Sequence, residues 1–348
     1  MPKTTVVTTT IYLPEFLLAY EENAKHYGHD VDFIVIGDKK TPDTAEALCR
    51  EIKNCLYMDL VDQEKYLQRF PALRDHLPVN SISRRNIGHL LAYENGADSI
   101  IMLDDDNLSI PDQDFVYHHT LVGKTESIHT YQAYNGWFNV CKALEEKHGV
   151  EFYARGFPPG MRWKSKGYSL QCRAEKVAVN AGLWLNDPDI DALTRLERRL
   201  LTTGMKPHWP TTFALRSGTW SPWNCQNTAI SREALPSYFL SPHTGRHLDI
   251  WASYITTRCA EVMGQVIAFG SPLAFHDRSS HNLYKDLEQE IPWIQSTDEF
   301  VSVLREAKVE GSSYSECLRS VIDALENTWN HPVKKQYLEG LRVWNDIF

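Results

Sequence analysis

Three consecutive carboxylates that follow a short apolar stretch are the residues of this sequence with the clearest chemical potential. Residues 100–103 are Ile-Ile-Met-Leu, and Asp104, Asp105 and Asp106 come directly after them. This pattern predicts a buried strand that ends at the ligand-binding edge of an open α/β sheet. On an extended backbone Asp104 and Asp106 point the same way and could share one divalent cation, whereas Asp105 points elsewhere. The alternative interpretation is a solvated acidic turn.

Two strand-helix units near the start of the chain predict the sheet that positions these carboxylates. Residues 5–9 and 32–38 have the β-branched and apolar character of strands, and residues 14–27 and 41–53 have helical spacing of apolar side chains. Repeated βα units indicate a parallel sheet with helical crossovers. Thr9, Thr10 and Asp38 then lie at the ligand edge, where Asp38 could accept a hydrogen bond from a ribose or a base. Asp38 could equally cap the following turn.

A basic segment precedes the helix predicted at residues 83–93. Arg85 and Asn86 lie at its N-terminal end, which suits the binding of base or phosphate oxygens. An exposed basic turn is the alternative. Residues 55–80 are mixed in character and contain Pro71 and Pro78, so we expect a variable connection there.

The middle of the chain combines a basic loop with a strand that carries a tryptophan. Residues 153–166 are rich in arginine, lysine, glycine and proline without helical or strand periodicity, which favours a functional loop. Trp184 follows in an apolar strand, and Asp189 and Asp191 come shortly after it. This set could hold a sugar pyrophosphate, with arginines on the phosphates, carboxylates on the hydroxyl groups and Trp184 against a sugar face.

Two further candidate site residues, one for catalysis or sugar binding and one for metal binding, lie closer to the C-terminus. Asp249 is predicted at the start of a helix, where it could act as a general base or bind a sugar hydroxyl, or could simply interact with the helix dipole. His276 follows an apolar run and precedes Arg278, Asn282 and Lys285. This arrangement resembles a metal ligand attached to a phosphate-binding loop.

The chain from about residue 297 onward has the periodicity of amphipathic helices. We expect one catalytic domain over residues 1–295 and a helical extension over residues 296–348. The extension could serve packing or the formation of a homo-oligomer.

Composition narrows the classes of partner and compartment. The net charge of -9 argues against a nucleic-acid partner, because phosphate backbones require a clustered basic surface. The seven cysteines are scattered without a C-x-x-C pair, which indicates reduced thiols. No apolar stretch is long enough to span a bilayer, and no signal-peptide pattern is present. The pattern predicts a cytoplasmic enzyme.

Taken in order, these motifs resemble those of the reversibly glycosylated polypeptide family, the UDP-arabinopyranose mutases, and of bacterial nucleotide-sugar pyranose–furanose mutases. The resemblance runs from the first strand to about Lys285, and the Gly-Leu-Trp-Leu-Asn string is its most specific part. The matching motifs are the Asp104-Asp105-Asp106 triplet, Arg155-Gly156-Phe157-Pro158 leading to Arg162, Gly182-Leu183-Trp184-Leu185-Asn186 followed by Pro188-Asp189-Ile190-Asp191-Ala192, Gly245-Arg246 with Asp249 and Trp251, and His276 with Ser279 and Ser280.

This resemblance implies a glycosyltransferase-A-like fold and a divalent metal, Mn²⁺ or Mg²⁺, with no flavin and no NAD. The family arginine that is proposed to become glycosylated maps onto Arg162, and a weaker alignment ends at Arg173 instead. Leu248 stands where the family usually has an aspartate, so the sugar contacts could differ. The matched Trp251 is expected to contact the sugar.

The expected activity is a metal-dependent interconversion of the pyranose and furanose forms of a GDP- or UDP-linked sugar. The expected residues are, for metal, Asp104, Asp106 and His276; for the nucleotide, Thr9, Thr10, Asp38, Arg85, Asn86, Asp105, Arg278, Asn282 and Lys285; for the sugar, Trp184, Asp189 and Trp251; and for catalysis, Arg162, Arg173, Asp191 and Asp249. Two alternatives remain: a glycosyltransferase with an external acceptor, and a sugar-nucleotide-binding scaffold protein.

Overall fold

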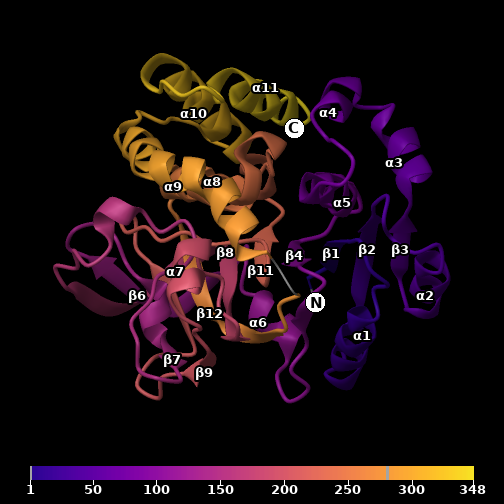
Figure 1. Cartoon of the computed structure of the whole chain (residues 1–348), viewed down its shortest axis with the longest axis horizontal. Helices are drawn as coiled ribbons and strands as arrows, with labels where there is room; N and C mark the ends of the chain where they lie inside the picture. Colours follow the sequence, from indigo (N-terminus) through magenta and orange to yellow (C-terminus); the bar gives the residue numbers. More distant parts are fainter. Residues whose placement is uncertain (1, 280–281) are drawn as a thin grey trace.

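A parallel half-sheet begins the fold in the computed structural model, which describes residues 2–279 and 282–348 (Figure 1). β1 (Thr4–Thr10) pairs in parallel with β2 (Val31–Gly37) on one side and β4 (Ser99–Leu103) on the other, and β3 (Cys55–Met58) pairs with β2. Because a strand exposes alternate side chains to opposite faces, Val7 belongs to one apolar core and Val6 to the other. The two βα units predicted from the sequence are confirmed.

The crossover helices cover both faces of these strands. They are α1 (Phe16–His26), α2 (Ala45–Glu51) and α5 (Arg85–Glu94). In α5, Gly88 lies directly over β1, where an added Cβ would be only 2.4 Å from Val7 Cγ1. A side chain at this position would push α5, and Arg85 with it, away from the sheet.

The remaining strands make the sheet mixed rather than mostly parallel. β11 (Thr228–Ser231) runs antiparallel to both β4 and β8 (Tyr168–Asn186), and β6 (Thr125–Ala133) runs antiparallel to β8. β12 (Gln265–His276) is parallel to β8 and antiparallel to β10 (Thr212–Leu215). The predicted α/β class with a helix-flanked sheet is confirmed, whereas the parallel order is confined to part of the sheet.

A short pairing joins the two parts of the sheet beside the acidic triplet. β5 (Asn107–Leu108) runs antiparallel to the end of β12, with Asn107 opposite His276. The backbone N–H of Asp277 also donates to the carbonyl of Asp106 at 2.9 Å. This pairing brings His276 to the triplet from a position 170 residues away in the chain.

The C-terminal helices pack on the sheet domain as one body with it. α8 (Leu248–Val262), α9 (Leu283–Glu306), α10 (Tyr314–Thr328) and α11 (Lys334–Asn345) gather at one end of the molecule (Figure 1). Trp251 of α8 is fully buried and stacks on Phe300 of α9 with ring centroids 4.0 Å apart. The expected boundary between residues 295 and 296 falls inside α9, and both sides of it share the same core.

Several shorter elements complete the chain. Residues 55–80, expected as a variable connection, contain β3 and two helices, because their apolar side chains pack on the sheet although the prolines interrupt the sequence pattern.

Among the described residues no helix is long and apolar enough to cross a membrane. The shorter helices and strands are α3 (Leu60–Leu67), α4 (Pro71–Asp75), α6 (Phe115–His119), α7 (Ala192–Glu197), β7 (Leu144–Glu146) and β9 (Thr202–Met205).

Candidate functional site

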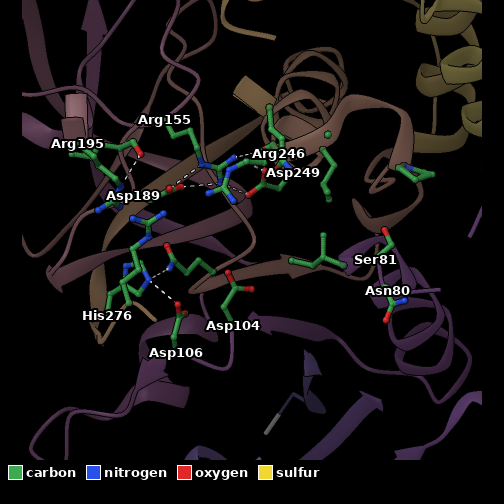
Figure 2. A pocket seen from close by; sticks show the side chains of 18 residues that line it. Asn80, Ser81, Asp104, Asp106, Arg155, Asp189, Arg195, Arg246, Asp249 and His276 are labelled. Atoms are coloured by element: carbon green, nitrogen blue, oxygen red, sulfur yellow. Dashed lines mark hydrogen bonds and ion pairs between the residues drawn. The ribbon is translucent and has the colours of Figure 1, made fainter. Parts of the chain in front are cut away.

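A cleft lies at the carboxyl ends of the central strands and consists of two adjoining cavities. One has a volume of about 560 Å³ and the other of about 420 Å³, sizes that are typical of ligand sites. Asp104 and Asp106 line both cavities, so they stand at their junction. Figure 2 shows the two residues in the larger cavity. The predicted ligand edge of the sheet is therefore an open cleft.

The three carboxylates of the triplet point to three different partners. Asp104 Oδ1 accepts from Arg85 Nη2 at 2.6 Å, and Asp105 Oδ2 accepts from Thr10 Oγ1 at 2.7 Å. Asp106 Oδ2 lies 3.2 Å from His276 Nε2. The expected extended geometry is wrong, because β4 ends at Leu103 and the backbone turns there, with the N–H of Asn107 donating to the carbonyl of Asp104. Burial raises the pKa of Asp104 to about 6 against the attraction of Arg85.

Asp106 and His276 have several features of cation ligands. His276 Nδ1 lies 2.6 Å from the carbonyl oxygen of Asp187, so this nitrogen must carry the proton. Nε2 accepts from Gln226 Nε2 at 2.9 Å when the ring is neutral and donates to Asp106 Oδ2 at 3.2 Å when it is protonated. Burial opposes the charged ring, but Asp106 raises the pKa of His276. A cation that bound Nε2 would replace these contacts. Asp106 Oδ1 is buried without a hydrogen-bond partner among the described residues. A backbone acceptor that fixes the imidazole tautomer is common behind metal-bound histidines.

The expected three-residue metal site is nevertheless not assembled. The described part of the chain holds no group of three or more histidine, cysteine or acidic side chains arranged to bind a metal. Asp104 is the member that is out of place, since it forms an ion pair with the almost fully buried Arg85. Asp106 and His276 fit a cation as a pair, and a bound cation would have to compete with Arg85 for Asp104.

Arg155 is the central side chain of the larger cavity. Its Nε and Nη2 donate to the two carboxylate oxygens of Asp189 at 2.9 and 3.0 Å, and its Nη1 and Nη2 donate to those of Asp249 at 3.1 and 2.9 Å. Nη1 also donates to the carbonyl of Arg246. Burial opposes charge at Arg155 and Asp189, but the ion pairs raise the pKa of Arg155 and hold that of Asp189 well below its usual range. We call Arg155, Asp189 and Asp249 the arginine clamp (Figure 2).

The backbone around Arg155 explains its placement. Gly156 has a φ of +77°, and a Cβ there would lie 2.2 Å from Ile250 Cγ2, so only glycine lets the loop approach α8 this closely. The hydroxyl of Tyr254 donates to the Gly156 carbonyl at 2.8 Å. The Arg-Gly pair thus fixes the loop on the helix that carries Asp249.

Three more arginines line the larger cavity together with the arginine clamp: Arg195, Arg246 and Arg278. Arg278 pairs with Asp286 at 2.8 Å, and Arg246 pairs with Glu290 at 3.0 Å. Burial and the neighbouring charge of Arg195 lower the pKa of Arg278. Cationic side chains that repel each other across a cavity favour an anion between them, so the three arginines suit a pyrophosphate.

The smaller cavity contains most of the predicted nucleotide residues. Thr9, Thr10, Asp38, Arg85 and Asp105 all line it. Asp38 accepts hydrogen bonds from the backbone N–H groups of residues 80 and 81, at 2.8 and 3.1 Å. Asp38 therefore holds the segment that borders both cavities.

Four predicted residues lie in the core and outside the cleft. Trp184 and Trp251 are buried at 4% and 0% exposure, so neither can stack on a sugar. Asn86 exchanges hydrogen bonds with the backbone of Leu240, so it holds two segments together. Asp191 begins α7 and pairs with Arg162 at 2.5 Å, outside the cavity lining. The two tryptophans pack in the apolar core, Asn86 bonds a backbone segment, and Asp191 caps α7, so none of the four side chains is available to a ligand in the cleft.

The remaining predicted residues separate into those near the cleft and those far from it. Arg162 is engaged with Asp191 and does not line either cavity, and Arg173 lies on the exposed start of β8, paired with Glu175 at 3.0 Å. Asn282 caps α9 and Lys285 is exposed on it, so neither lines the cleft. Ser280 of the matched motif lies outside the described residues.

Sequence reasoning placed the arginines of the 153–166 loop on the phosphates without singling out Arg155, and it overlooked Arg195 and Gln226. Arg155 had a usable signal, since it begins the Arg-Gly-Phe-Pro motif, and the arginine seven residues later was preferred. Arg195 sits on α7 and Gln226 lies in a loop, and neither has local features that distinguish it from a surface residue. Only the folded sheet brings them to the cavity.

Comparison with known proteins supports the resemblance seen in the motifs. UDP-arabinopyranose mutase 3 of Arabidopsis thaliana is 30% identical over 147 residues, which is 38% of this chain and 40% of that protein. Probable UDP-arabinopyranose mutase 1 of Solanum tuberosum is 29% identical over 171 residues, or 43% of this chain and 42% of that protein. The matches thus span about two fifths of the length of these curated relatives. No protein-family model matches the chain.

Solved structures give a weaker likeness. Glucosyl-3-phosphoglycerate synthase of Mycobacterium tuberculosis, in complex with Mn²⁺ and UDP-glucose, is 11% identical with a TM-score of 0.44, covering 85% of this chain and 78% of that one. The sheet order and the acidic triplet after β4 confirm the expected α/β class and the position of the triplet at a strand end. The curated relatives confirm the resemblance of this chain to the UDP-arabinopyranose mutases, and the two matches given above cover 38% and 43% of it.

Proposed function

We propose that this protein is a mutase that interconverts the pyranose and furanose forms of a sugar linked to UDP or GDP. The observation that carries the proposal is the arginine clamp, which places two buried carboxylates in the same cleft as the Asp104-Asp105-Asp106 turn. The similarity to proteins named UDP-arabinopyranose mutase supports it.

The two cavities suit the two parts of such a substrate. The nucleoside would occupy the smaller cavity at the ends of β1 and β2, beside Thr10 and Asp38. The pyrophosphate would lie at the junction and face Arg195 and Arg278, whose forked guanidinium groups match phosphate oxygens. The sugar would then reach Asp189 and Asp249.

Asp106 and His276 would hold a divalent cation, Mn²⁺ or Mg²⁺, at the same junction. The buried Asp106 Oδ1 without a partner and the lone pair of His276 Nε2 are the features that fit it. A cation bound there supplies charge neutralisation for the departing nucleotide.

The conversion exchanges one ring oxygen for another. The bond between C1 and the nucleotide oxygen must break and re-form, the C1–O5 bond must give way to a C1–O4 bond, and one proton must move from O4 to O5. Asp249 and Asp189 can accept hydrogen bonds from these hydroxyl groups, while Arg155 keeps both carboxylates oriented. The site must also exclude water, because water that reaches C1 hydrolyses the substrate.

An acceptor-free incubation tests the proposal. The protein is mixed with Mn²⁺ and a panel of UDP- and GDP-sugars, and the nucleotide sugars are followed by chromatography and NMR. A new isomer of unchanged mass is expected, absent with EDTA and lost in Arg155→Met and Asp106→Asn. Arg173→Met, a change of an exposed arginine, serves as the matched control and should keep the activity. Nucleotide release without an isomer would contradict the mutase and favour a glycosyltransferase.

A further inference from the structure

A buried glutamine lies directly beside the two residues assigned to the cation. Gln226 is 6% exposed and lines the larger cavity together with Asp106 and His276. Its Nε2 lies 2.9 Å from His276 Nε2, and the same imidazole nitrogen lies 3.2 Å from Asp106 Oδ2. The three side chains therefore meet around one imidazole nitrogen, and the proposed function uses only two of them.

The hydrogen bonds of Asn224 determine which end of the Gln226 amide faces the imidazole. Asn224 Nδ2 donates to the carboxylate of Asp189 at 2.6 Å and to Gln226 Oε1 at 3.2 Å, and Asn224 Oδ1 accepts from the backbone N–H of Gln226 at 3.2 Å. Because a carboxylate only accepts and a backbone N–H only donates, both ends of the Asn224 amide are fixed. Gln226 Oε1 then faces Asn224, and Nε2 faces His276.

Cation binding at His276 Nε2 is incompatible with this orientation of Gln226. Such binding uses the lone pair that now accepts from Gln226 Nε2, and it leaves an amide NH₂ group, which only donates, facing a positive charge. Rotation about the last bond of the side chain exchanges Nε2 and Oε1, so that a carbonyl oxygen faces the cation instead. The rotation breaks the 3.2 Å bond to Asn224, whereas Asn224 keeps its shorter bond to Asp189.

A carbonyl oxygen also suits the cations expected here. Mn²⁺ and Mg²⁺ prefer oxygen ligands, which include amide carbonyls as well as carboxylates. Asp104, the expected third ligand, forms an ion pair with Arg85 at 2.6 Å. Asp106 Oδ1 is buried without a hydrogen-bond partner among the described residues. With Asp106 and His276, an amide oxygen from Gln226 makes a set of three protein ligands that does not need Asp104.

We infer that Gln226 is a ligand of the divalent cation, which it binds through Oε1 together with Asp106 and His276. This inference rests on the cation assigned to the proposed function and adds a ligand to it. Because Gln226 takes the place expected for Asp104, the ion pair of Asp104 with Arg85 stays intact when the cation binds.

Titration calorimetry with Mn²⁺ alone tests the inference without turnover. Gln226→Met keeps an unbranched side chain but removes the carbonyl oxygen, so Mn²⁺ affinity should fall about 10-fold or more. Gln171 is exposed at the start of β8 and lines neither cavity, so Gln171→Met is the matched control and should keep the wild-type affinity. Asp106→Asn removes an assigned ligand and serves as the positive control.

A change of metal preference distinguishes a ligand from a residue that only positions His276. Gln226→His replaces the amide by an imidazole, which favours Ni²⁺, whereas a carbonyl oxygen favours Mn²⁺. The ratio of Ni²⁺ affinity to Mn²⁺ affinity should therefore rise about 10-fold or more above the wild-type ratio. A residue that only held His276 in place would alter both affinities alike. Gln171→His should keep the wild-type ratio.

The outcomes separate the inference from the proposed function. Wild-type Mn²⁺ affinity in Gln226→Met would overturn the inference, and so would an unchanged ratio in Gln226→His, which decides alone if the methionine variant does not fold. In either case, loss of Mn²⁺ binding in Asp106→Asn would leave the cation of the proposed function in place. If Mn²⁺ did not bind to the wild type, the cation site of the proposed function would be wrong together with the inference.

Discussion

Replacing Arg155 by methionine should destabilise the protein strongly, because the change leaves two buried carboxylates without their partner. Arg155, Asp189 and Asp249 have side-chain exposures of 11%, 14% and 8%. Removing one member of a buried ion-pair network costs about 3–5 kcal/mol of unfolding free energy, since the remaining charge stays uncompensated. Asp189 keeps one hydrogen bond, from Asn224 Nδ2 at 2.6 Å, which offsets part of the loss.

The loss should depend on pH in a defined direction. In the wild type, Arg155 holds the pKa of Asp189 well below that of an unfolded aspartate. This contributes stability that is present above about pH 4 and disappears as the pH falls through the lower folded value. In Arg155→Met that contribution is absent, and burial instead favours the protonated carboxyl group. The difference in unfolding free energy between the two proteins should therefore be largest near pH 7 and shrink toward pH 4.

Urea denaturation at several pH values, followed by tryptophan fluorescence, measures these differences. Arg155→Lys keeps the charge but cannot donate to four oxygens from one plane, so its loss should be intermediate. Arg173→Met is the matched control, since Arg173 is 47% exposed and pairs only at the surface with Glu175, and it should change stability by no more than about 0.5 kcal/mol. A loss below about 1 kcal/mol in Arg155→Met, or one independent of pH, would refute the reasoning about the arginine clamp.

Three further predictions address the cation, the core and the reactive arginine. Mn²⁺ affinity should fall about 10-fold or more in Asp106→Asn. In the wild type it should weaken as the pH falls and protons compete for His276, because the contact with Asp106 raises the pKa of that imidazole although burial opposes its charge; titration calorimetry measures both effects. Trp251→Ala should cost about 3–5 kcal/mol of unfolding free energy, because it removes the stack with α9 at 4.0 Å. Peptide mass spectrometry after incubation with substrate should find no covalently retained sugar on Arg162, because Arg162 is paired with Asp191 outside the cavity lining.

Each of these has its own control and contrary result. Asp112→Asn changes an exposed aspartate and should leave Mn²⁺ affinity unaltered, and equal affinities for wild type and Asp106→Asn would exclude the assigned ligand. If Trp251→Ala instead weakened only nucleotide-sugar binding, Trp251 would be a sugar contact after all. Detection of the sugar on Arg162 would show that the loop rearranges when substrate binds.

Local patterns in the sequence were sufficient for the strands, the helices and the ligand edge. The apolar run of residues 100–103 and the two βα units each bury a face that only a sheet with crossover helices can cover, so the class of fold followed from periodicity. The placement of Thr10, Asp38, Asp104 and Asp106 at the cleft followed as well, because all of them come where a strand ends.

Which side chains meet in the cleft was decided by the tertiary structure. Arg155, Asp189 and Asp249 come from a loop, the segment after β8 and the start of α8, and no local spacing relates them. Trp251 and Trp184 were misassigned for the converse reason: a tryptophan beside a functional motif looks the same in the sequence whether its ring faces a ligand or the core. A strand or helix pattern depends on neighbours in the chain, whereas an ion pair or a buried ring depends on residues that only folding brings together.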